Sequence, residues 1–309
     1  MKTAFVFSGQ GAQYLGMGKE FYDHSQMVRN IFEEASEALG EDLSAICFED
    51  EKKIHFTPYT QPAILTVSYA IERSLNEEGI TPDMVAGLSL GEYTALVSSG
   101  ALTFSEAVKL VHKRGSLMEE AVPDGKGKMA AVIGLDAALI ESICDEVSQT
   151  DYVTVANYNT PTQLVLSGSS AGVDKAMIKA EEAKAKRVVE LKVSGPFHSL
   201  LLEPAAQEFM TVLKDSHFST STIPVYSNVT AEQYPDSQSI PTLLTQQMTS
   251  SVRFEQMILQ MIDDGATDFI EVGPGKTLRS FIKAIDKSVA VKNIEKVSQL
   301  QKLVENKHG

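Results

Sequence analysis

The chain has 309 residues, and its 27 lysines and arginines stand against 41 aspartates and glutamates, which gives a formal net charge of −14. Hydrophobic residues make up 43% and charged residues 22%, so the composition excludes a disordered chain, and the length suits one or two folded domains. A strongly acidic chain lacks the clustered positive charge that follows a phosphate backbone, so we expect no nucleic acid among its main partners.

Short apolar runs rich in Val, Ile and Phe alternate along the chain with longer stretches of helical period. Strands are predicted over residues 4–8, 84–89, 223–228, 269–272 and 289–294. Between them, helices are predicted over residues 60–78, with Pro62 in the first turn, and over residues 104–121. This alternation is typical of an α/β domain with a mainly parallel sheet.

Residues 126–194 follow a different pattern. Their predicted elements are strand 129–134, helix 137–147, strand 152–158, strand 163–168, helix 171–183 and strand 187–193. This order, β-α-β-β-α-β, is that of a ferredoxin-like unit, and turn-forming residues stand at both of its ends. We therefore predict a discontinuous large α/β domain, residues 1–125 and 195–309, that carries residues 126–194 as an inserted small subdomain.

Several classes of protein and site are disfavoured. Two cysteines, Cys47 and Cys144, cannot build a disulfide framework, which favours a reducing compartment. No apolar run reaches the ~18 residues that span a bilayer, and the N-terminus lacks the apolar core of a signal peptide. No residue spacing indicates a metal site, and the glycine-rich stretches 9–13 and 273–277 each miss a glycine that a nucleotide loop needs. We expect a cytoplasmic protein with no membrane, metal or cofactor.

The strongest local signal is Gly87-Leu88-Ser89-Leu90-Gly91, a G-x-S-x-G pattern between a predicted strand and a helix-like stretch. Such glycines allow a sharp strand-to-helix turn that exposes the serine hydroxyl, while the next amide faces developing negative charge. The loop of residues 8–13 can supply a second amide to this oxyanion hole. Ser89 is therefore the candidate nucleophile, and a purely structural turn is the alternative.

A serine nucleophile needs a base, and the chain has six histidines. His198 follows the predicted strand 187–193 through a short loop, where catalytic side chains are often presented. The other histidines, which lie in polar segments or near the chain end, are expected to be solvated: His24, His55, His112, His217 and His308. No Asp or Glu identifies itself as a third triad member, so a backbone carbonyl or an amide side chain can orient the imidazole in a Ser-His dyad.

Arg114 interrupts the apolar stripe of the helix predicted over residues 104–121. An arginine on a buried stripe must find an anion, because an unpaired buried guanidinium is very costly. An internal carboxylate, or a side chain that reaches out to solvent, would satisfy it. The other interpretation is a fork that binds a substrate carboxylate, with Gly115 leaving room for close approach.

Taken together, these residues resemble the malonyl-CoA:acyl-carrier-protein transacylases of fatty-acid synthesis, which are related to the acyltransferase domains of polyketide synthases. The resemblance covers nearly the whole chain and rests on ordered motifs: Phe7-Ser8-Gly9-Gln10-Gly11-Ala12-Gln13, Gly87-Leu88-Ser89-Leu90-Gly91-Glu92-Tyr93, Lys113-Arg114-Gly115, Asn159-Thr160-Pro161-Thr162-Gln163, Gly195-Pro196-Phe197-His198-Ser199 and Glu271-Val272-Gly273-Pro274-Gly275. It implies an α/β-hydrolase-like large domain with parallel sheet and an inserted ferredoxin-like subdomain. One departure is Leu88, where many relatives carry histidine.

The resemblance also implies residue roles. Ser89 would be the nucleophile, His198 the base, and Arg114 would bind the malonyl carboxylate. Gln10 and the Leu90 amide would form the oxyanion hole, the main chain of Gln247 would hold the histidine, and Phe197 would exclude a branched α-carbon. The implied reaction moves a malonyl group from malonyl-CoA to the phosphopantetheine thiol of acyl carrier protein. A serine thioester hydrolase and a non-catalytic module that docks carrier protein remain alternatives.

Carrier proteins of this pathway are acidic, so an acidic enzyme needs local positive charge where they dock. Two basic runs are candidates: Lys184, Lys186, Arg187 and Lys192 form one, and Lys276, Arg279, Lys283, Lys287 and Lys292 form the other. The docking residues we select from them are Lys184, Lys186, Arg187, Lys276, Arg279 and Lys283. We predict that one or both runs lie beside the cleft between the domains. We expect the protein to be a monomer.

Overall fold

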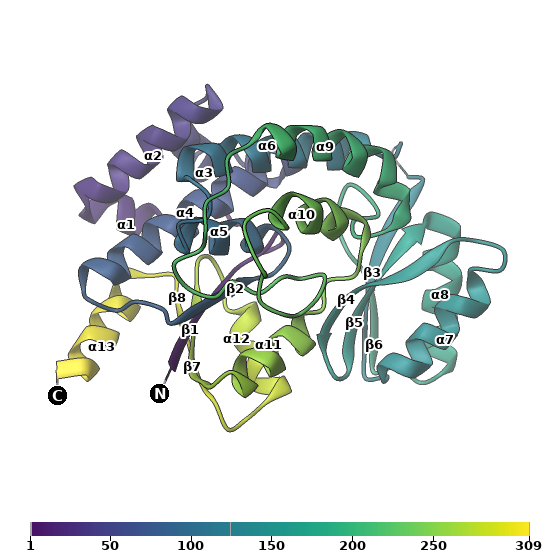
Figure 1. Cartoon of the computed structure of the whole chain (residues 1–309). Helices are drawn as coiled ribbons and strands as arrows, with labels where there is room; N and C mark the ends of the chain where they lie inside the picture. Colours follow the sequence, from purple (N-terminus) through teal and green to yellow (C-terminus); the bar gives the residue numbers. More distant parts are fainter. Residues whose placement is uncertain (1, 124, 309) are drawn as a thin grey trace.

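The computed structural model describes residues 2–123 and 125–308. It contains a four-stranded sheet in the order β2-β1-β7-β8 and a second four-stranded sheet in the order β4-β5-β3-β6 (Figure 1). All pairings of the first sheet are parallel, and all pairings of the second are antiparallel. The predicted α/β fold, a parallel sheet with a separate antiparallel subdomain, is confirmed.

The parallel sheet consists of β1 (Lys2–Phe7), β2 (Met84–Gly87), β7 (Ala266–Val272) and β8 (Ala290–Ile294). Phe5 of the central strand pairs with Val85 on one side and Ile270 on the other. Phe5 and Phe7 pack into one apolar core, whereas Ala4 and Val6 pack into a second core on the opposite face. Burial on both faces explains why β1 is a continuous apolar run rather than an alternating one.

Helices cover both faces of this sheet (Figure 1). One face packs against helices that include α4 (Thr57–Glu77), α5 (Leu90–Ser98) and α6 (Phe104–Glu120). The other face packs against α11 (Phe254–Asp263) and α12 (Thr277–Ile285). The remaining helices of this unit are α1 (Lys19–His24), α2 (Gln26–Leu39), α3 (Leu43–Phe48), η1 (Lys53–His55), η2 (Leu200–Leu202), α9 (Glu203–Asp215), α10 (Ile240–Thr249) and α13 (Val297–His308).

The strand predicted over residues 223–228 is wrong. This segment forms only isolated bridges, a parallel one from Val225 to Val85 and an antiparallel one from Tyr226 to Gln233. Pro224 offers only its carbonyl oxygen, which accepts from the Val85 amide at 2.9 Å. Tyr226 donates its amide to the Val85 carbonyl oxygen at 3.1 Å, but Pro224 has no amide proton for the preceding rung and the Asn228 amide bonds Glu92 instead of β2. The segment therefore touches the edge of β2 without continuing the sheet.

Helix α4 begins earlier than predicted, at Thr57, with Pro58 in its first turn. Pro62 therefore lies inside the helix and supplies no amide proton to the Pro58 carbonyl. His112 bonds that carbonyl instead, with Nδ1 at 2.9 Å from the oxygen. The histidine that was expected to be solvated is thus a half-buried partner of the helix that Pro62 interrupts.

The antiparallel sheet consists of β3 (Gly127–Ile133), β4 (Val153–Thr160), β5 (Gln163–Ser169) and β6 (Arg187–Glu190). Helices α7 (Ala137–Val147) and α8 (Ser170–Glu182) cover its outer face and enclose a small core of their own. Its other face turns toward the larger unit, as Met129 and Val165 join the main core. The segment predicted as ferredoxin-like has this element order, while the boundaries at residues 125/126 and 194/195 stay a prediction.

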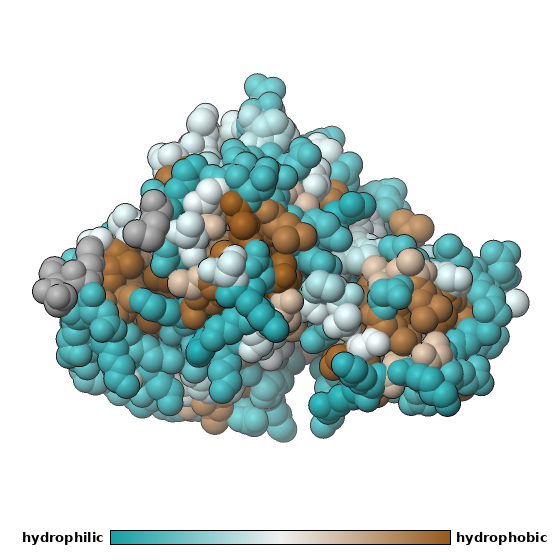
Figure 2. All heavy atoms as spheres, turned by 90° about the horizontal axis from the view of Figure 1, so that it is seen from below, coloured by the Kyte–Doolittle hydropathy of each residue, from teal (hydrophilic) through white to brown (hydrophobic). Residues whose placement is uncertain are grey.

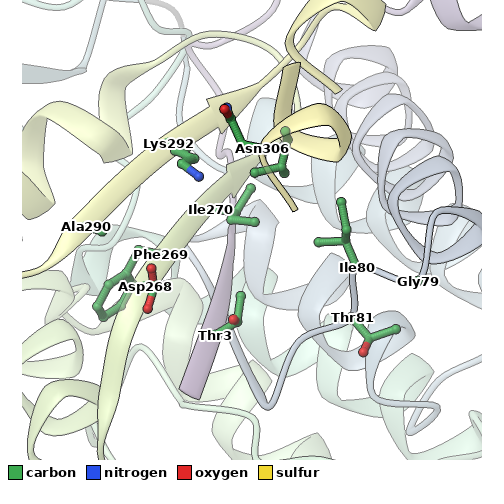
Figure 3. A pocket seen from close by; sticks show the side chains of 11 residues that line it. Thr3, Gly79, Ile80, Thr81, Asp268, Phe269, Ile270, Ala290, Lys292 and Asn306 are labelled. Carbon is green, nitrogen blue, oxygen red and sulfur yellow. The ribbon is translucent and has the colours of Figure 1, made fainter. Parts of the chain in front are cut away.

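Seen from below, the molecule has a larger and a smaller lobe with a notch between them, and apolar side chains gather on each lobe within hydrophilic surroundings (Figure 2). A cavity of about 290 Å³ lies at the amino ends of the parallel strands, where Thr3, Ile80, Asp268, Lys292 and Asn306 surround it (Figure 3). Within the described residues, no helix combines the length and the apolar character needed to cross a membrane.

Candidate active site

Ser89 lies at the sharp turn between β2 and α5, with φ 53° and ψ −102°. A positive φ is unfavourable for a residue with a side chain, so the surroundings must hold it. A Cβ at Gly87 would overlap the Gly91 backbone, and one at Gly91 would overlap the Phe7 carbonyl oxygen. Both glycines of the motif are therefore required by close backbone approach, as expected for an elbow rather than an ordinary turn.

His198 lies against the serine. Its Nε2 is 2.8 Å from Ser89 Oγ, and its Nδ1 is 2.7 Å from the main-chain oxygen of Gln247. A carbonyl oxygen can only accept, so Nδ1 carries the proton and Nε2 is left to accept the proton of the serine hydroxyl. The imidazole is oriented by a backbone carbonyl, as in the dyad that the sequence left open.

The environment of His198 keeps its imidazole neutral. Burial of the ring, with the nearby charge of Arg114 as the next cause, lowers the pKa of His198 to about 4. Its side chain is almost wholly enclosed, so the charged imidazolium loses hydration while it meets another cation. At neutral pH the ring is therefore in the form that a general base requires.

We expect the pH dependence of Ser89 reactivity to reveal the charge of Arg114. With a small uncharged serine-directed sulfonyl fluoride, the inactivation rate of the wild-type protein should rise with pH through a pKa of about 4 and then level off, because only neutral His198 is a base. In Arg114→Met the rise should move to higher pH, since one cause of the low pKa is gone while burial remains. Coincident normalised profiles would show that the guanidinium does not act on His198.

Arg114 is 1% exposed on α6, so its side chain does not reach solvent. Its Nη2 donates to Ser89 Oγ at 3.0 Å and to Gln247 Oε1 at 2.8 Å, and its Nη1 donates to Gln61 Oε1 at 2.9 Å. None of the ion pairs among the described residues involves it, and its Nε has no hydrogen-bond partner there. The guanidinium is thus buried beside the nucleophile without a directly paired carboxylate.

Gly115 has a different role from the one expected. A Cβ at this position would lie 2.8 Å from the Thr57 carbonyl oxygen and 2.9 Å from Pro58 Cα. The space that the glycine leaves is filled by the backbone of α4, so it allows close packing of α4 on α6 rather than approach of a substrate.

A cavity of about 350 Å³ opens above Ser89 and His198. The larger unit contributes Gln10, Leu88 and Phe197 to its wall, and the smaller unit contributes residues of three strands and the chain after β6. The residues from the smaller unit are Met129, Ala131, Asn157, Asn159, Gln163, Val165, Leu191, Lys192 and Val193. The nucleophile therefore lies at the interface between the two sheets.

Two backbone amides beside the nucleophile have no hydrogen-bond acceptor within the described residues. Leu90 is the first residue of α5 and follows the nucleophile directly, and Gln10 lies in the loop after β1 that lines the same cavity. Neither amide makes a hydrogen bond within the described part of the chain. An unpaired amide next to the reacting serine, at a helix N-terminus, is the kind of donor that stabilises a tetrahedral intermediate.

The structure adds buried residues that the sequence reasoning missed. Asn228 Oδ1 accepts from the Ser89 amide at 2.6 Å, and Gln61 holds Arg114 from the side opposite Gln247. Glu92, three residues after Ser89, accepts a hydrogen bond from Gln247 Nε2 at 2.6 Å. Of these residues, only Glu92 could have been noticed in the sequence. It directly follows the G-x-S-x-G motif, in the first turn of an otherwise uncharged helix, where a carboxylate is unusual.

Each basic run approaches the cavity at one end, whereas Lys292 of the second run lies at the other cavity, at the amino ends of the parallel strands. Lys192 lines it, and Lys276 immediately precedes Thr277 of α12, which also lines it. Of the docking candidates, Arg279 is half-buried and the others are exposed: Lys184, Lys186, Arg187, Lys276 and Lys283. None of them takes part in the ion pairs found among the described residues.

Known proteins are similar in sequence to this chain over nearly its whole length. The family model for the acyl transferase domain matches residues 4–308. The malonyl CoA-acyl carrier protein transacylase of Bacillus subtilis is 45% identical over 301 residues, which cover 96% of this chain and 95% of that protein. The chain belongs to the malonyl CoA-acyl carrier protein transacylase family.

Solved structures agree with this family. The crystal structure of MCAT from Streptococcus pneumoniae is 49% identical, with a TM-score of 0.95 over 99% of this chain and 100% of that one. A malonyl-transacylase in complex with its type II PKS acyl-carrier protein is 37% identical, with a TM-score of 0.96 over 99% of this chain and 100% of that one. The family resemblance expected from the motifs is confirmed.

The described residues contain no cluster of three or more His, Cys, Asp or Glu side chains that could hold a metal ion. The groups around Ser89 are instead amides, a guanidinium and an imidazole. Their arrangement suits acyl transfer through a serine ester, in which a base, a nucleophile and oxyanion donors meet at one carbonyl.

Proposed function

We propose that this protein transfers the malonyl group of malonyl-CoA to the phosphopantetheine thiol of acyl carrier protein, for fatty-acid synthesis, through a malonyl ester on Ser89. Membership of the family supports the activity, and one geometric observation supports the route. Ser89 Oγ is held between His198 Nε2 at 2.8 Å and Arg114 Nη2 at 3.0 Å. A base and a cation at the same hydroxyl suit an acyl group that ends in a carboxylate.

In the first half-reaction His198 takes the Ser89 proton while the oxygen attacks the thioester carbonyl. The amides of Gln10 and Leu90 stabilise the oxyanion, the carbon–sulfur bond breaks, and His198 returns the proton to the departing coenzyme A thiolate. In the second half the carrier thiol gives its proton to His198 and attacks the ester. The carbon–oxygen bond then breaks, and Ser89 recovers its proton.

Arg114 and Phe197 determine which acyl group is accepted in this mechanism. The guanidinium binds the free malonyl carboxylate, because it lies beside Ser89 with no paired carboxylate of its own. Phe197, which is buried and lines the cavity, limits the space for a branch on the α-carbon. Gln247 holds the imidazole through its main chain and Arg114 through its side chain.

The test follows the malonyl group by intact-protein mass spectrometry. Incubated with malonyl-CoA alone, the protein should gain one malonyl group, and holo acyl carrier protein added afterwards should remove it and become malonylated itself. Rapid release of free malonate without a carrier thiol would favour a hydrolase instead. A protein that binds carrier protein yet never becomes acylated would be a docking module.

We further propose that the exposed residues of the two basic runs dock the acidic carrier protein. Reversing charge in Lys186→Glu with Lys276→Glu should lower kcat/KM for carrier protein by about tenfold, with a weaker dependence on salt, because rim charges act mainly on encounter. Transfer to a small pantetheine thiol should not change. Lys302→Glu on α13 is the matched control, and equal losses with both acceptors would contradict the docking role.

We also propose that the protein works as a cytoplasmic monomer. The two cysteines are buried and unpaired, which agrees with a reducing compartment. Sedimentation at working concentrations tests the monomer, and a stable dimer would overturn it.

A further inference from the structure

A buried carboxylate lies directly behind the elbow. Glu92 is the third residue of α5 and is fully enclosed. Its Oε2 accepts from Gln247 Nε2 at 2.6 Å and from the Asn228 amide at 3.2 Å, and its Oε1 accepts from the Tyr234 hydroxyl. The two N–H partners can only donate, and the Tyr234 hydroxyl is able to, so the network stabilises the ionised carboxylate. Burial raises the pKa of Glu92 to about 7, and these hydrogen bonds together with the charge of Arg114 oppose that rise.

Glu92 is one of the groups that fix which way the Gln247 amide points, and it makes the shortest of the amide's hydrogen bonds. The Gln247 Nε2 group donates both to Glu92 and to the Ser89 carbonyl oxygen, at 3.0 Å. Both of these atoms are acceptors, so the amide nitrogen must face them and the amide oxygen must face away. On that other side Oε1 accepts from Arg114 at 2.8 Å. A flipped amide would put a donor against the guanidinium and a third oxygen against two acceptors.

The same carboxylate lies one amide away from the guanidinium. Gln247 bonds Glu92 through its nitrogen and Arg114 through its oxygen, so it separates two buried opposite charges. A carboxylate bonded directly to Arg114 would occupy the guanidinium N–H groups that the malonyl carboxylate of the acyl donor needs. With the amide in between, the ionised form of Glu92 offsets part of the guanidinium charge while the Nη2 group continues to point at Ser89.

We propose that Glu92 is a positioning residue for malonyl selection, which acts through Gln247 to hold Arg114 aimed at the acyl group and to compensate its charge from a distance. This inference rests on the proposed function. Glu92 does not line the cavity, and its carboxylate makes no hydrogen bond to Ser89 Oγ, so its replacement should alter the preference for a carboxylate-bearing donor more than the chemistry at the serine.

The experiment is a competition in one tube. The protein is mixed with malonyl-CoA and excess acetyl-CoA, and the ratio of malonylated to acetylated Ser89 is read by intact mass. This ratio does not depend on the fraction of active protein. In Glu92→Gln, which keeps the shape and removes the charge, the ratio should fall by about tenfold, and in Glu92→Leu, which also removes the acceptors, by more.

Glu72→Gln is the matched control, because Glu72 is another buried carboxylate, on α4, whose hydrogen bond comes from Ser98. Its ratio should equal that of the wild type. A purely structural role for Glu92 would lower both acylations together and leave the ratio unchanged, which would overturn the proposal. If Glu92→Leu does not fold, Glu92→Gln decides alone. A wild-type protein that shows no preference for malonyl would overturn the proposed function instead, and this inference with it.

Discussion

Ser89→Ala is expected to abolish formation of the malonyl-protein. The hydroxyl lies between His198 and Arg114, at 2.8 and 3.0 Å, and alanine leaves no oxygen to attack the thioester. Removing the nucleophile of a serine enzyme costs at least about a thousandfold in rate. Intact mass after incubation with malonyl-CoA should show no adduct, and carrier protein should stay unmodified over many wild-type turnovers.

The matched control for this variant is Ser99→Ala. Ser99 is a buried serine just beyond the other end of α5, where its hydroxyl bonds the Leu96 carbonyl. The Ser99→Ala protein should be acylated on Ser89 to the same extent as the wild type. Undiminished malonyl transfer by Ser89→Ala, confirmed on protein of verified sequence, would mean that the acyl group travels by another route.

Arg114→Met should separate malonyl from acetyl donors. Methionine fills much of the buried space but cannot pair with a carboxylate, and truncating one member of a buried charged pair costs about 2–5 kcal/mol. Acylation by malonyl-CoA should therefore fall by at least about 30-fold in kcat/KM, whereas acylation by acetyl-CoA should change by less than about threefold. Both rates come from quenched-flow acylation followed by mass spectrometry.

Lys113→Met is the control on the same helix. The Lys113 ammonium pairs with Glu208 at 2.8 Å on the exposed side of α6, so the substitution removes a positive charge without changing the cavity. Neither donor should be affected beyond about twofold, because exposed ion pairs contribute little. Equal losses with both donors in Arg114→Met would assign the guanidinium to the serine or to folding rather than to the malonyl carboxylate.

The fold was largely predictable because its strands are signalled locally. The apolar run of β1 and the element order of the inserted segment follow from hydrophobic pattern alone. Residues 223–228 have the same apolar character but meet only the edge of β2, since Pro224 cannot donate to a neighbour. The start of α4 was misplaced because Pro62 mimics a first-turn proline, and the contact from His112 that accommodates it is distant in sequence.

The site was predictable where one residue carries unusual chemistry. Ser89 stands in a glycine-framed turn, and Arg114 interrupts an apolar stripe, so each is visible without a structure. Gln61 and Asn228 are ordinary amides that matter only because α4 and the segment 223–228, which bridges to β2, bring them to Arg114 and Ser89. Their signal lies in long-range packing, and a single sequence does not contain it.

The arrangement of β3 beside β6 separates the two parts of the active site. Ala130 near the start of the inserted segment pairs with Glu190 near its end, so the chain leaves the larger unit and returns to it at nearly the same place. The larger unit supplies Ser89, His198 and Arg114, whereas the inserted segment supplies only cavity wall. Exchanging residues 126–194 between relatives is therefore expected to replace the smaller unit's share of the cavity wall as a whole, and to leave the reacting groups and the wall residues Gln10, Leu88 and Phe197 in place.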